Sequence, residues 1–397
     1  MNLKLSILSA LFLTQFASLT PVVKAAVDVE PVRLINFFNS EKVVKVDIKM
    51  ADWDKLRNAE PAGGHCSWGY IGPRYEWIAA EKVTVNGVSF DNVGTKKRSW
   101  CGSQSNSKPS LTIKFDEYED SNKAKADAAF GIDNLVLNNS VQDKSYVRAC
   151  LAYQMFRSAG VAAPRCNFVN LTVNGKNMGL YVNLQSYKKD FFKANFDKKL
   201  GNLYEIEGTN FSDWAVERLM GNLNAFKDDT SGQDIRSLIS ALDVAESGNW
   251  DPLFKKFNPT EFQNFWAIEL MIGHWDGMVK SNNNSYAYFA EGKMRPLPWG
   301  ADQVFSRNEN PNGFAKNRLA QLLWNSPVYR EQFRKRLWAK MDQLWNVGTL
   351  FAEIDSMVKA VSPYVTSTER SEFDRQIGVS KQFIKDRRAQ LSAQFPK

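Results

Sequence analysis

The stretch from His274 to Asp302 reads HWDGMVKSNNNSYAYFAEGKMRPLPWGAD and is the densest cluster of polar residues in the chain. It directly follows a predicted helix that begins at Glu261, in which apolar residues recur every three or four positions from Phe262 to Ile272. Within the stretch, Tyr286 to Phe289 and Met294 to Trp299 read as a pair of strands. The sequence therefore predicts a helix, a polar loop and a hairpin in succession.

Acid and amide side chains flank this polar loop. Gly273 and Gly277 free the backbone, Asp276 lies between them, and Asn282 to Asn284 precede the hairpin that returns the chain to Asp302. Oxygens gathered in this way suit a magnesium ion and a nucleotide phosphate, because Mg²⁺ prefers a few hard oxygen ligands and keeps several waters. We therefore expect Asp276, one asparagine and Asp302 to lie together.

A purely structural interpretation of the same residues stays open. Asparagine adopts left-handed turns readily, so the spacing by itself favours a turn with an Asx cap followed by a hairpin. In that case His274 packs at a helix end, and Trp275 and Trp299 pack between lobes. The spacing alone therefore leaves the metal site open but does not require it.

Outward from this stretch, the first half of the chain has the period of strands. Apolar and polar residues alternate in Val43 to Met50, Lys82 to Val88 and Asn167 to Val173. Asn86-Gly87 and Asn174-Gly175 predict hairpins, because both central residues of a type I′ turn need positive φ. The N-terminal region is therefore predicted to be a hairpin-rich sheet.

Helical periods account for most of the remaining chain. One helix is expected from Lys144 to Ala159, with Gly160 at its C-terminal end. Thr260 with Gln263 is interpreted as a capping box, and Ser326 followed by Pro327 as the start of another helix. The other helical periods are Leu319 to Trp324, Tyr329 to Trp345 and Leu350 to Val361. The expected fold is α+β, with a β-rich lobe followed by a mainly helical lobe.

The N-terminus has the layout of a cleaved secretory signal. A short basic start precedes an apolar run, Leu5 to Leu19, and a small-residue site ends at Ala25. The expected organisation is a signal over residues 1–25, a β-rich lobe over 26–208 and a helical lobe over 209–397. No later segment is long and apolar enough to span a bilayer. We expect the protein to be secreted, periplasmic or on the cell surface.

The cysteine count fits this destination. Four cysteines in an oxidising compartment favour disulfides over a thiol or zinc site. We prefer Cys66 with Cys101 and Cys150 with Cys166, because each pair closes a short span. The formal net charge of +8 favours acidic partners in general. Lysines and arginines are scattered among acids rather than arranged in a basic stripe, so no nucleic-acid partner is expected.

Several segments resemble the CotH kinase family. FWAIELMIGHWDGMVKSNNNSYAYF followed by PLPWGADQVF resembles the family's helix, Asp-Gly turn, Asn-rich loop, aromatic strand and PWDxD-like ending. The segment 170–208 resembles its Asn-Gly hairpin and GNLY element. Residues 143–171 resemble its helix near an Asp and an Arg, here Asp143 and Arg148, and KPSLTIKF from Lys108 resembles its Lys-Pro strand.

This resemblance implies a two-lobed kinase-like fold that binds ATP with Mg²⁺ or Mn²⁺ and phosphorylates proteins. It implies that Asp276 is the catalytic acid and that Asn283 and Asp302 are metal ligands. Lys108 is then the candidate for a phosphate-facing cation, and Arg98 is a second one. A solvated strand lysine is the competing interpretation of Lys108, because charged residues are mostly exposed.

The chain departs from the family pattern at three places. Gly300 stands where the family has the first Asp of PWDxD, and glycine has no side chain to ligate a metal. Gln185 stands where the family often has an acid, and RSWCGS, from Arg98 to Ser103, replaces an RGNSS-like segment. A catalytically weakened pseudokinase or binding module on the same fold is therefore the main alternative to an active kinase.

A third class is a carbohydrate-binding or hydrolytic surface protein. It would use Glu205 and Glu207 as an acid and base pair, since residues two apart on a strand share one face. Such pairs are common on solvated strands, and the sequence offers no GxSxG or HExxH motif. We rank this class last.

Overall fold

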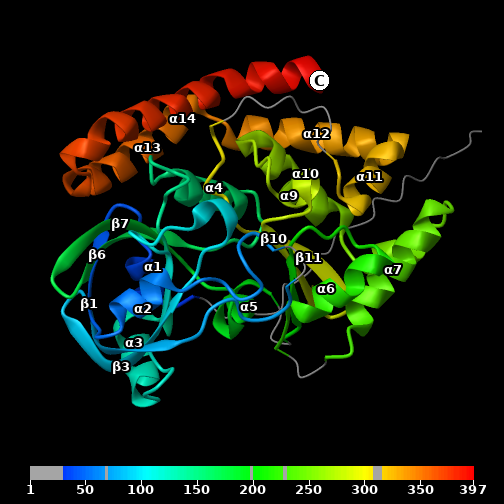
Figure 1. Cartoon of the computed structure of the whole chain (residues 1–397). Helices are drawn as coiled ribbons and strands as arrows, with labels where there is room; N and C mark the ends of the chain where they lie inside the picture. Colours follow the sequence, from blue (N-terminus) through cyan, green and yellow to red (C-terminus); the bar gives the residue numbers. More distant parts are fainter. Residues whose placement is uncertain (1–29, 68–69, 197–199, 227–229, 307–314) are drawn as a thin grey trace, which may run out of the picture.

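Two β-sheets organise the chain in the computed structural model, which describes residues 30–67, 70–196, 200–226, 230–306 and 315–397. Strands β1 to β7 form a closed barrel, and a second sheet has the order β11-β10-β8-β9. Helices dominate after residue 230 (Figure 1). This arrangement confirms the α+β prediction of a β-rich lobe followed by a helical part. The predicted signal, residues 1–25, lies outside the described residues.

The barrel strands run in the order β1-β2-β3-β4-β5-β7-β6. Their bounds are β1 Val43–Lys49, β2 Ile78–Val85, β3 Val88–Lys97, β4 Leu111–Lys114, β5 Asn134–Asn138, β6 Cys166–Val173 and β7 Lys176–Leu184. Along β1 the even-numbered residues are buried, as the alternation predicts. Parallel pairing of β1 with β6 closes the barrel. Closure removes the exposed edges that an open sheet would leave.

Both Asn-Gly turns are confirmed. Asn86 and Gly87 have φ of 45° and 88°, and Asn174 and Gly175 have φ of 50° and 79°. The first turn joins β2 to β3 and the second joins β6 to β7. Positive φ at both central residues is the reason these sequences form tight hairpins.

The second sheet is built from β8 (Asn202–Ile206), β9 (Leu223–Ala225), β10 (Ser285–Ala290) and β11 (Lys293–Pro298). The last two strands confirm the predicted hairpin after the polar loop. Strand β8 lies before the predicted lobe boundary at residue 208, yet it pairs with β10 in this sheet. The division of the chain at residue 208 stays a prediction.

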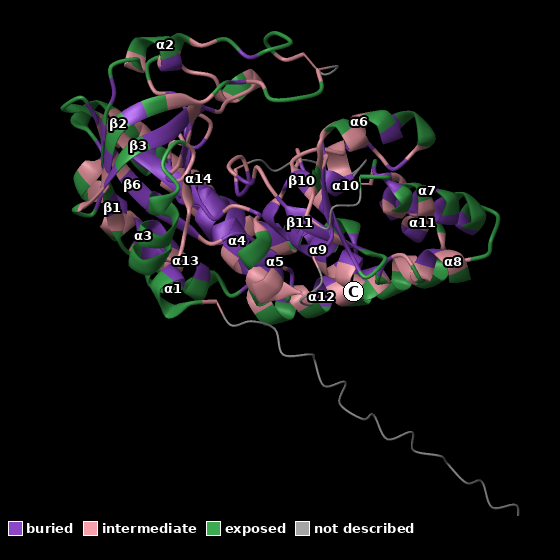
Figure 2. Ribbon diagram, turned by 90° about the horizontal axis from the view of Figure 1, so that it is seen from below, coloured by how far each residue is buried: buried purple, intermediate pink, exposed green. Residues whose placement is uncertain are grey.

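Helices surround the two sheets. Those before the second sheet are α1 Val32–Phe37, α2 Trp53–Asn58, α3 Ser121–Phe130, α4 Arg148–Ser158 and α5 Lys189–Asn195. Those after β8 are α6 Val216–Gly221, α7 Gln233–Glu246, α8 Asp251–Phe254, α9 Pro259–Ile272, α10 Met278–Ser281, α11 Arg318–Asn325, α12 Pro327–Leu344, α13 Val347–Val361 and α14 Ser367–Gln394. The most buried segments lie on the barrel strands, α4, α9 and β10–β11 (Figure 2). No helix among the described residues is long and apolar enough to cross a membrane.

Two predicted helix starts are corrected. Helix α9 is capped by Asn258, whose side chain accepts from the Thr260 amide at 2.9 Å, so Thr260 and Gln263 lie inside the helix and form no capping box. Helix α4 begins at Arg148 because the preceding loop is held by the Asp143 carboxylate, which accepts from the Ser145 amide and hydroxyl. The predicted start of α12, with Ser326 as N-cap and proline first, is confirmed.

Helix α14 ties the two halves of the molecule together. Its Ser380 accepts a hydrogen bond from Arg148 at the start of α4, and its Arg387 donates to the carbonyls of Leu270 and Met271 at the end of α9. In Figure 1 this helix runs along one side of the molecule, from the barrel to the helical lobe. Helix α14 therefore holds the end of α9, which leads into the polar loop, in place.

The two disulfides are those the spacing predicts. Cys66 pairs with Cys101, and Cys150 of α4 pairs with Cys166 of β6. The second bond fastens α4 to the barrel. Covalent links of this kind restrict the unfolded chain and so favour the folded state.

Candidate functional site

The polar loop begins where α9 ends. Gly273 has φ of 69° and closes the helix in a left-handed conformation, after which the His274 amide donates to the Glu269 carbonyl at 2.8 Å. Glycine is favoured there because other residues meet steric strain at positive φ. The chain is thereby turned sharply toward Asp276.

Glu269 braces this turn from inside the protein. Its carboxylate is 3% exposed and accepts from the amides of Met278 and Val279, both at 2.9 Å. His274 Nδ1 lies 3.3 Å from the same carboxylate. A Cβ at Gly277 would lie 2.2 Å from Glu269 Oε1, so the turn needs glycine at this position. The glycine that follows Asp276 is thus required because the Glu269 side chain occupies the space of a Cβ.

Asp276 is held by two asparagines. Its Oδ1 accepts from Asn283 Nδ2 at 3.1 Å, and its Oδ2 accepts from Asn284 Nδ2 at 2.7 Å. Asn282 and Asn284 have φ of 52° and 42°, so they also make the left-handed turns of the structural interpretation. The two interpretations therefore coexist: the asparagines shape the loop and orient the carboxylate.

Gly300 approaches this group from the end of β11. Its φ is 54°, and a Cβ on it would lie 2.3 Å from Asn284 Oδ1. The Trp299 amide donates to the Asn284 carbonyl at 3.0 Å, which keeps the two segments together. The acid that the family pattern has at this position is excluded here by the backbone conformation and by Asn284.

Asp302 lies two residues after Gly300 and is half-buried. Its carboxylate accepts from Asn138 Nδ2 at 3.2 Å, at the end of β5. Burial, followed by the nearby Asp143 carboxylate, raises the pKa of Asp302 to about 6. A carboxylate in this situation gains from a nearby cation, which would offset both effects.

The two predicted cations differ in position. Arg98 follows β3, and its guanidinium lies over the Trp299 ring at 5.4 Å, so it reaches the segment that carries Gly300 and Asp302. Lys108 points elsewhere: its Nζ is 3.3 Å from the Tyr146 hydroxyl and lies over the Tyr146 and Tyr181 rings, each at 5.2 Å. Burial lowers the pKa of Lys108 to about 8. Among the described residues it shows no contact with Asp276 or Asp302.

Sequence reasoning missed Glu269 and Asn138. Glu269 had a signal, since it is an acid within the apolar stretch of a helix, and such acids usually have a specific partner when buried. Asn138 had none, because only the fold of the barrel brings it to Asp302. Gln185, which replaces a family acid, bonds instead with Glu30 and the Arg165 amide.

Glu205 and Glu207 do not act as a free pair of carboxylates. Glu207 lies just past β8 and forms ion pairs with Arg74 at 3.2 Å and Arg218 at 3.6 Å. Burial raises the pKa of Glu205, with the charge of Glu207 as the next cause. These contacts give the hydrolase interpretation no support.

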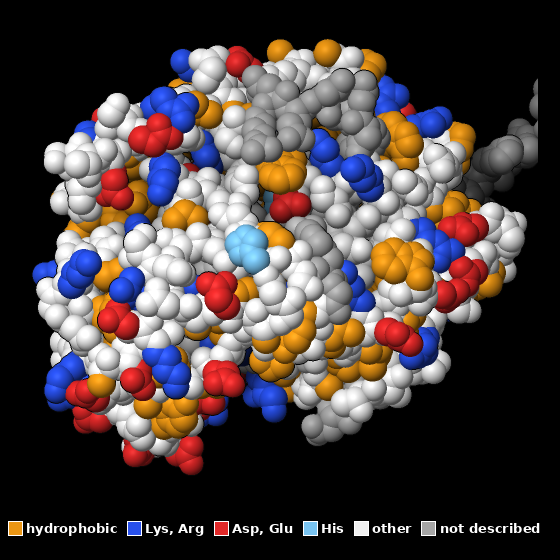
Figure 3. Space-filling view, in the orientation of Figure 1, with side chains coloured by type: hydrophobic (Ala, Val, Ile, Leu, Met, Phe, Trp, Pro, Cys, Tyr) orange, Lys and Arg blue, Asp and Glu red, His pale blue; other side chains and the backbone are white. Residues whose placement is uncertain are grey.

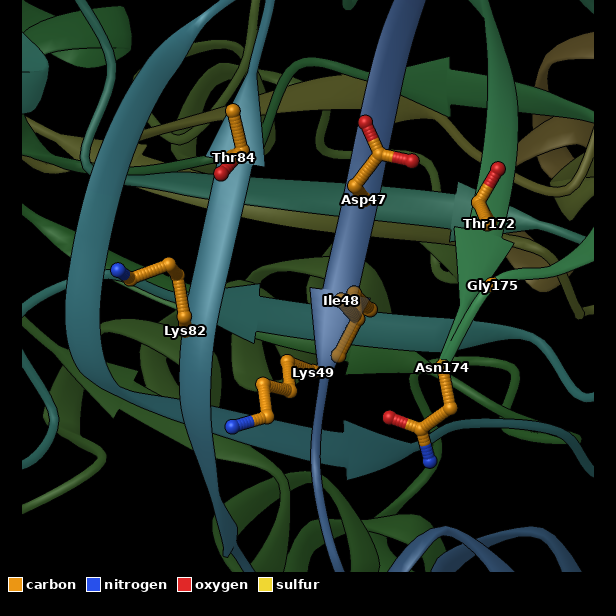
Figure 4. A pocket seen from close by; sticks show the side chains of 8 residues that line it. All are labelled: Asp47, Ile48, Lys49, Lys82, Thr84, Thr172, Asn174 and Gly175. Carbon is orange, nitrogen blue, oxygen red and sulfur yellow. The ribbon is translucent and has the colours of Figure 1, made fainter.

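A surface hollow of about 620 Å³ lies on the barrel (Figure 4). It is lined by Asp47, Ile48, Lys49, Lys82, Thr84, Thr172, Asn174 and Gly175. None of these residues belongs to the polar loop or to the Trp299–Asp302 segment. We therefore place the candidate site at the loop, where the polar side chains converge, and not in this hollow.

Acidic and basic side chains are interspersed over the face of the molecule seen in Figure 3. The polar loop, the aromatic hairpin and the Trp299–Asp302 segment meet in one candidate site of a protein of mixed α and β structure. The chain matches the family described as CotH kinase protein over residues 92–391, and it belongs to that family.

Three relatives share this similarity. Spore coat protein homolog 1 of Rhizopus delemar is 23% identical over 256 residues, which are 58% of this chain and 40% of that protein. Inner spore coat protein H of Bacillus subtilis is 21% identical over 287 residues, 65% of this chain and 77% of that protein. Invasin CotH7 of Rhizopus delemar is 22% identical over 246 residues, 56% of this chain and 41% of that protein. The chain thus spans about two fifths of each Rhizopus relative.

Among solved structures, a chain from the complex of HipA, HipB and operator DNA of Shewanella oneidensis MR-1 overlaps 64% of this chain and 57% of its own length. The TM-score is 0.34 and the identity 10%. This overlap is too small to support an inference about fold or function.

Proposed function

We propose that this chain is an exported CotH-type kinase that transfers phosphate from ATP to Ser or Thr of a protein outside the cytoplasm. The observation that supports this most strongly is the fixed carboxylate of Asp276, held by Asn283 and Asn284 on a turn that Glu269 braces. In phosphoryl transfer, an aspartate beside the acceptor hydroxyl orients the attacking oxygen and takes its proton. Asp276 would have that role.

The family also implies a divalent cation with the nucleotide. No three His, Cys, Asp or Glu side chains converge on a metal position within the described ranges. The fit is nevertheless adequate for Mg²⁺ or Mn²⁺, since one or two carboxylates suffice when phosphates and waters complete the shell. Asp302 would hold the metal, with the amide oxygen of Asn283 near Asp276. When bound, the cation supplies positive charge that offsets the charge of the phosphates.

Two features support an exported location. The N-terminal residues have the layout of a secretory signal. Both disulfides are typical of proteins that fold in an oxidising compartment. Two of the relatives are named as spore coat proteins, which is consistent with a protein substrate at a cell or spore surface.

One observation favours a second candidate, a pseudokinase or nucleotide-binding module. Gly300 replaces the principal metal acid of the family, and its surroundings leave no room for a side chain. A protein of this kind would retain the fold and bind ATP without transferring phosphate.

A labelled-phosphate assay on the chain without residues 1–25 separates the two candidates. The protein is incubated with γ-labelled ATP, Mg²⁺ or Mn²⁺, and proteins secreted by its own source, and labelled residues are identified by mass spectrometry. Metal-dependent label on Ser or Thr is the expected result. Saturable ATP binding with no label in any protein would reject the kinase and support the binding module.

A further inference from the structure

Residues 70–77 form a strap between the barrel and the second sheet. On the barrel side, the Arg74 guanidinium lies over the Trp100 ring at 4.3 Å, and the Tyr75 hydroxyl donates to a backbone carbonyl just after β3 at 2.9 Å. On the other side, Arg74 forms an ion pair with Glu207 at 3.2 Å, just past β8. One arginine of the strap therefore contacts both halves of the molecule.

The two segments that the strap contacts both reach the candidate site. Glu207 precedes Gly208, whose amide donates to the Asn282 carbonyl of the polar loop at 2.7 Å. The segment after β3 also carries Arg98, whose guanidinium lies over the Trp299 ring at 5.4 Å. A movement of the strap would therefore act on the surroundings of the site from two sides.

A disulfide fastens the strap to the segment after β3. Cys66, shortly before the strap, pairs with Cys101. Both cysteines have a left-handed backbone, with φ of 55° and 48°. Such a conformation is sterically costly for residues other than glycine and persists only where the surrounding structure imposes it. Opening of the bond removes one such constraint, so both residues can return to ordinary backbone conformations and loosen the strap.

The second disulfide differs from this one in both respects. Cys150 and Cys166 are 3% and 4% exposed, and they lie within α4 and β6. Cys66 and Cys101 are half-buried and lie outside the sheets and the longer helices. Thiol–disulfide exchange requires access of the attacking thiolate to a sulfur atom, so accessible disulfides are the labile ones. A reductant is therefore expected to reach Cys66–Cys101 first.

We propose that Cys66–Cys101 is a redox-sensitive bond that sets how firmly the strap joins the segment after β3 to Glu207. The reductant is a dithiol protein or small molecule outside the cytoplasm. One of its thiolates attacks a sulfur of the bond to give a mixed disulfide, and its second thiol then displaces the remaining cysteine. The chain gains two electrons and two protons, and the reductant leaves as its own disulfide. This inference goes beyond the proposed kinase activity and does not require it.

Thiol trapping tests the first step of this proposal. The purified chain is incubated with dithiothreitol, free thiols are alkylated at intervals, and the modified cysteines are identified by mass spectrometry. Cys66 and Cys101 are expected to be alkylated roughly 10-fold faster or more than Cys150 and Cys166, while the chain stays folded. Opening of both disulfides at the same rate, or of Cys150–Cys166 first, would overturn the proposal.

Tryptic cleavage after Arg74 tests release of the strap. The Arg74 side chain is 16% exposed in its ion pair, so trypsin reaches it only when the strap loosens. After alkylation and removal of the reductant, cleavage at Arg74 is expected to be roughly 10-fold faster or more than in the oxidised chain. Cleavage after Lys176, at the exposed Asn174-Gly175 turn, is the control and should not change.

The double variant Cys66→Ser with Cys101→Ser gives the open form without a reductant, and it should be cleaved after Arg74 as fast as the alkylated chain. If this variant does not fold, the alkylated native chain still gives the measurement. Cleavage after Arg74 at the oxidised rate, with Cys66–Cys101 shown to be open, would overturn the proposal. None of these measurements involves phosphate transfer, so their outcome is separable from failure of the proposed kinase activity.

Discussion

The Asp276 turn and the Trp299–Asp302 segment meet at one end of the second sheet but differ in how their polar groups are satisfied. At the turn, Asp276 has two amide donors and Glu269 serves two backbone amides. At the segment, Gly300 has no side chain, and the pKa of Asp302 is raised to about 6 by burial and the nearby Asp143. A pre-organised acid thus lies beside a region that a ligand would have to complete.

This difference separates two requirements of phosphoryl transfer. Orientation of the acceptor hydroxyl depends on a rigid acid, whereas charge neutralisation depends on cations and donors around the phosphates. The chain retains the rigid acid that orientation requires. It has altered the metal-binding position, at Gly300, that charge neutralisation requires in the family pattern. The substitutions below test each side of this comparison.

The largest effect on stability is expected at the braced turn. Glu269→Gln leaves one of the Met278 and Val279 amides without an acceptor inside the protein, which should lower the free energy of unfolding by about 1.5–3 kcal/mol. Urea denaturation measures this loss. Glu331→Gln on the exposed face of α12 is the control and should change little. Equal stability of the two variants would mean that Glu269 does not brace the turn.

A second substitution tests the segment. Gly300→Asp introduces the acid that the family has at this position. The left-handed φ and the contact with Asn284 should lower the free energy of unfolding by about 1–3 kcal/mol, and we expect no gain in metal affinity. Gly292→Asp is the matched control, since its φ is 75° but no atom lies within 4 Å of its Cβ position. The difference between the two measures the contact with Asn284 alone. A gain in Mg²⁺ affinity on Gly300→Asp would show that the segment still accepts the acid.

The smallest effect concerns the pH dependence of Asp302. Because its pKa in the folded protein is about 6 and its ordinary value is 3.8, the folded state binds the proton more tightly than the unfolded state. Below about pH 4 the group is protonated in both states and does not change the free energy of unfolding. Between about pH 4 and pH 6 ionisation increasingly lowers the free energy of unfolding, and above about pH 6 this loss stays constant. Asp302→Asn should raise the melting temperature by a few degrees at pH 7.5 and hardly at pH 4, by calorimetry at both values. An equal rise at both pH values would exclude this titration as the cause.

The parts of the fold that could be predicted are those with local causes. The Asn-Gly hairpins followed from the demand for positive φ, and the Ser326-Pro327 helix start from the constraints on proline. The start of α9 was missed because two adjacent caps competed and Asn258 with Pro259 prevailed. Closure of the barrel by β1 and β6 joins residues more than 100 positions apart, for which the sequence carries no local signal.

The candidate site shows the same limit. The grouping of Asp276 with the asparagines was predicted because they share one loop. The contact of Asp302 with Asn138 and the orientation of Lys108 toward Tyr146 depend on how the barrel packs on the rest of the chain. The absence of the acid at Gly300 was visible in the sequence, but its steric cause was not.

The measurement that tests the central claim most directly is single-turnover transfer of labelled phosphate from ATP in Mg²⁺ by the native chain, Asp276→Asn and Asp47→Asn. Asp47 lies exposed on β1, so its substitution serves as the control. The account predicts that Asp276→Asn lowers the rate by roughly 10²–10⁴-fold at an unchanged melting temperature, while Asp47→Asn transfers at the native rate. Transfer by Asp276→Asn at the native rate would contradict the assignment of Asp276 as the catalytic acid.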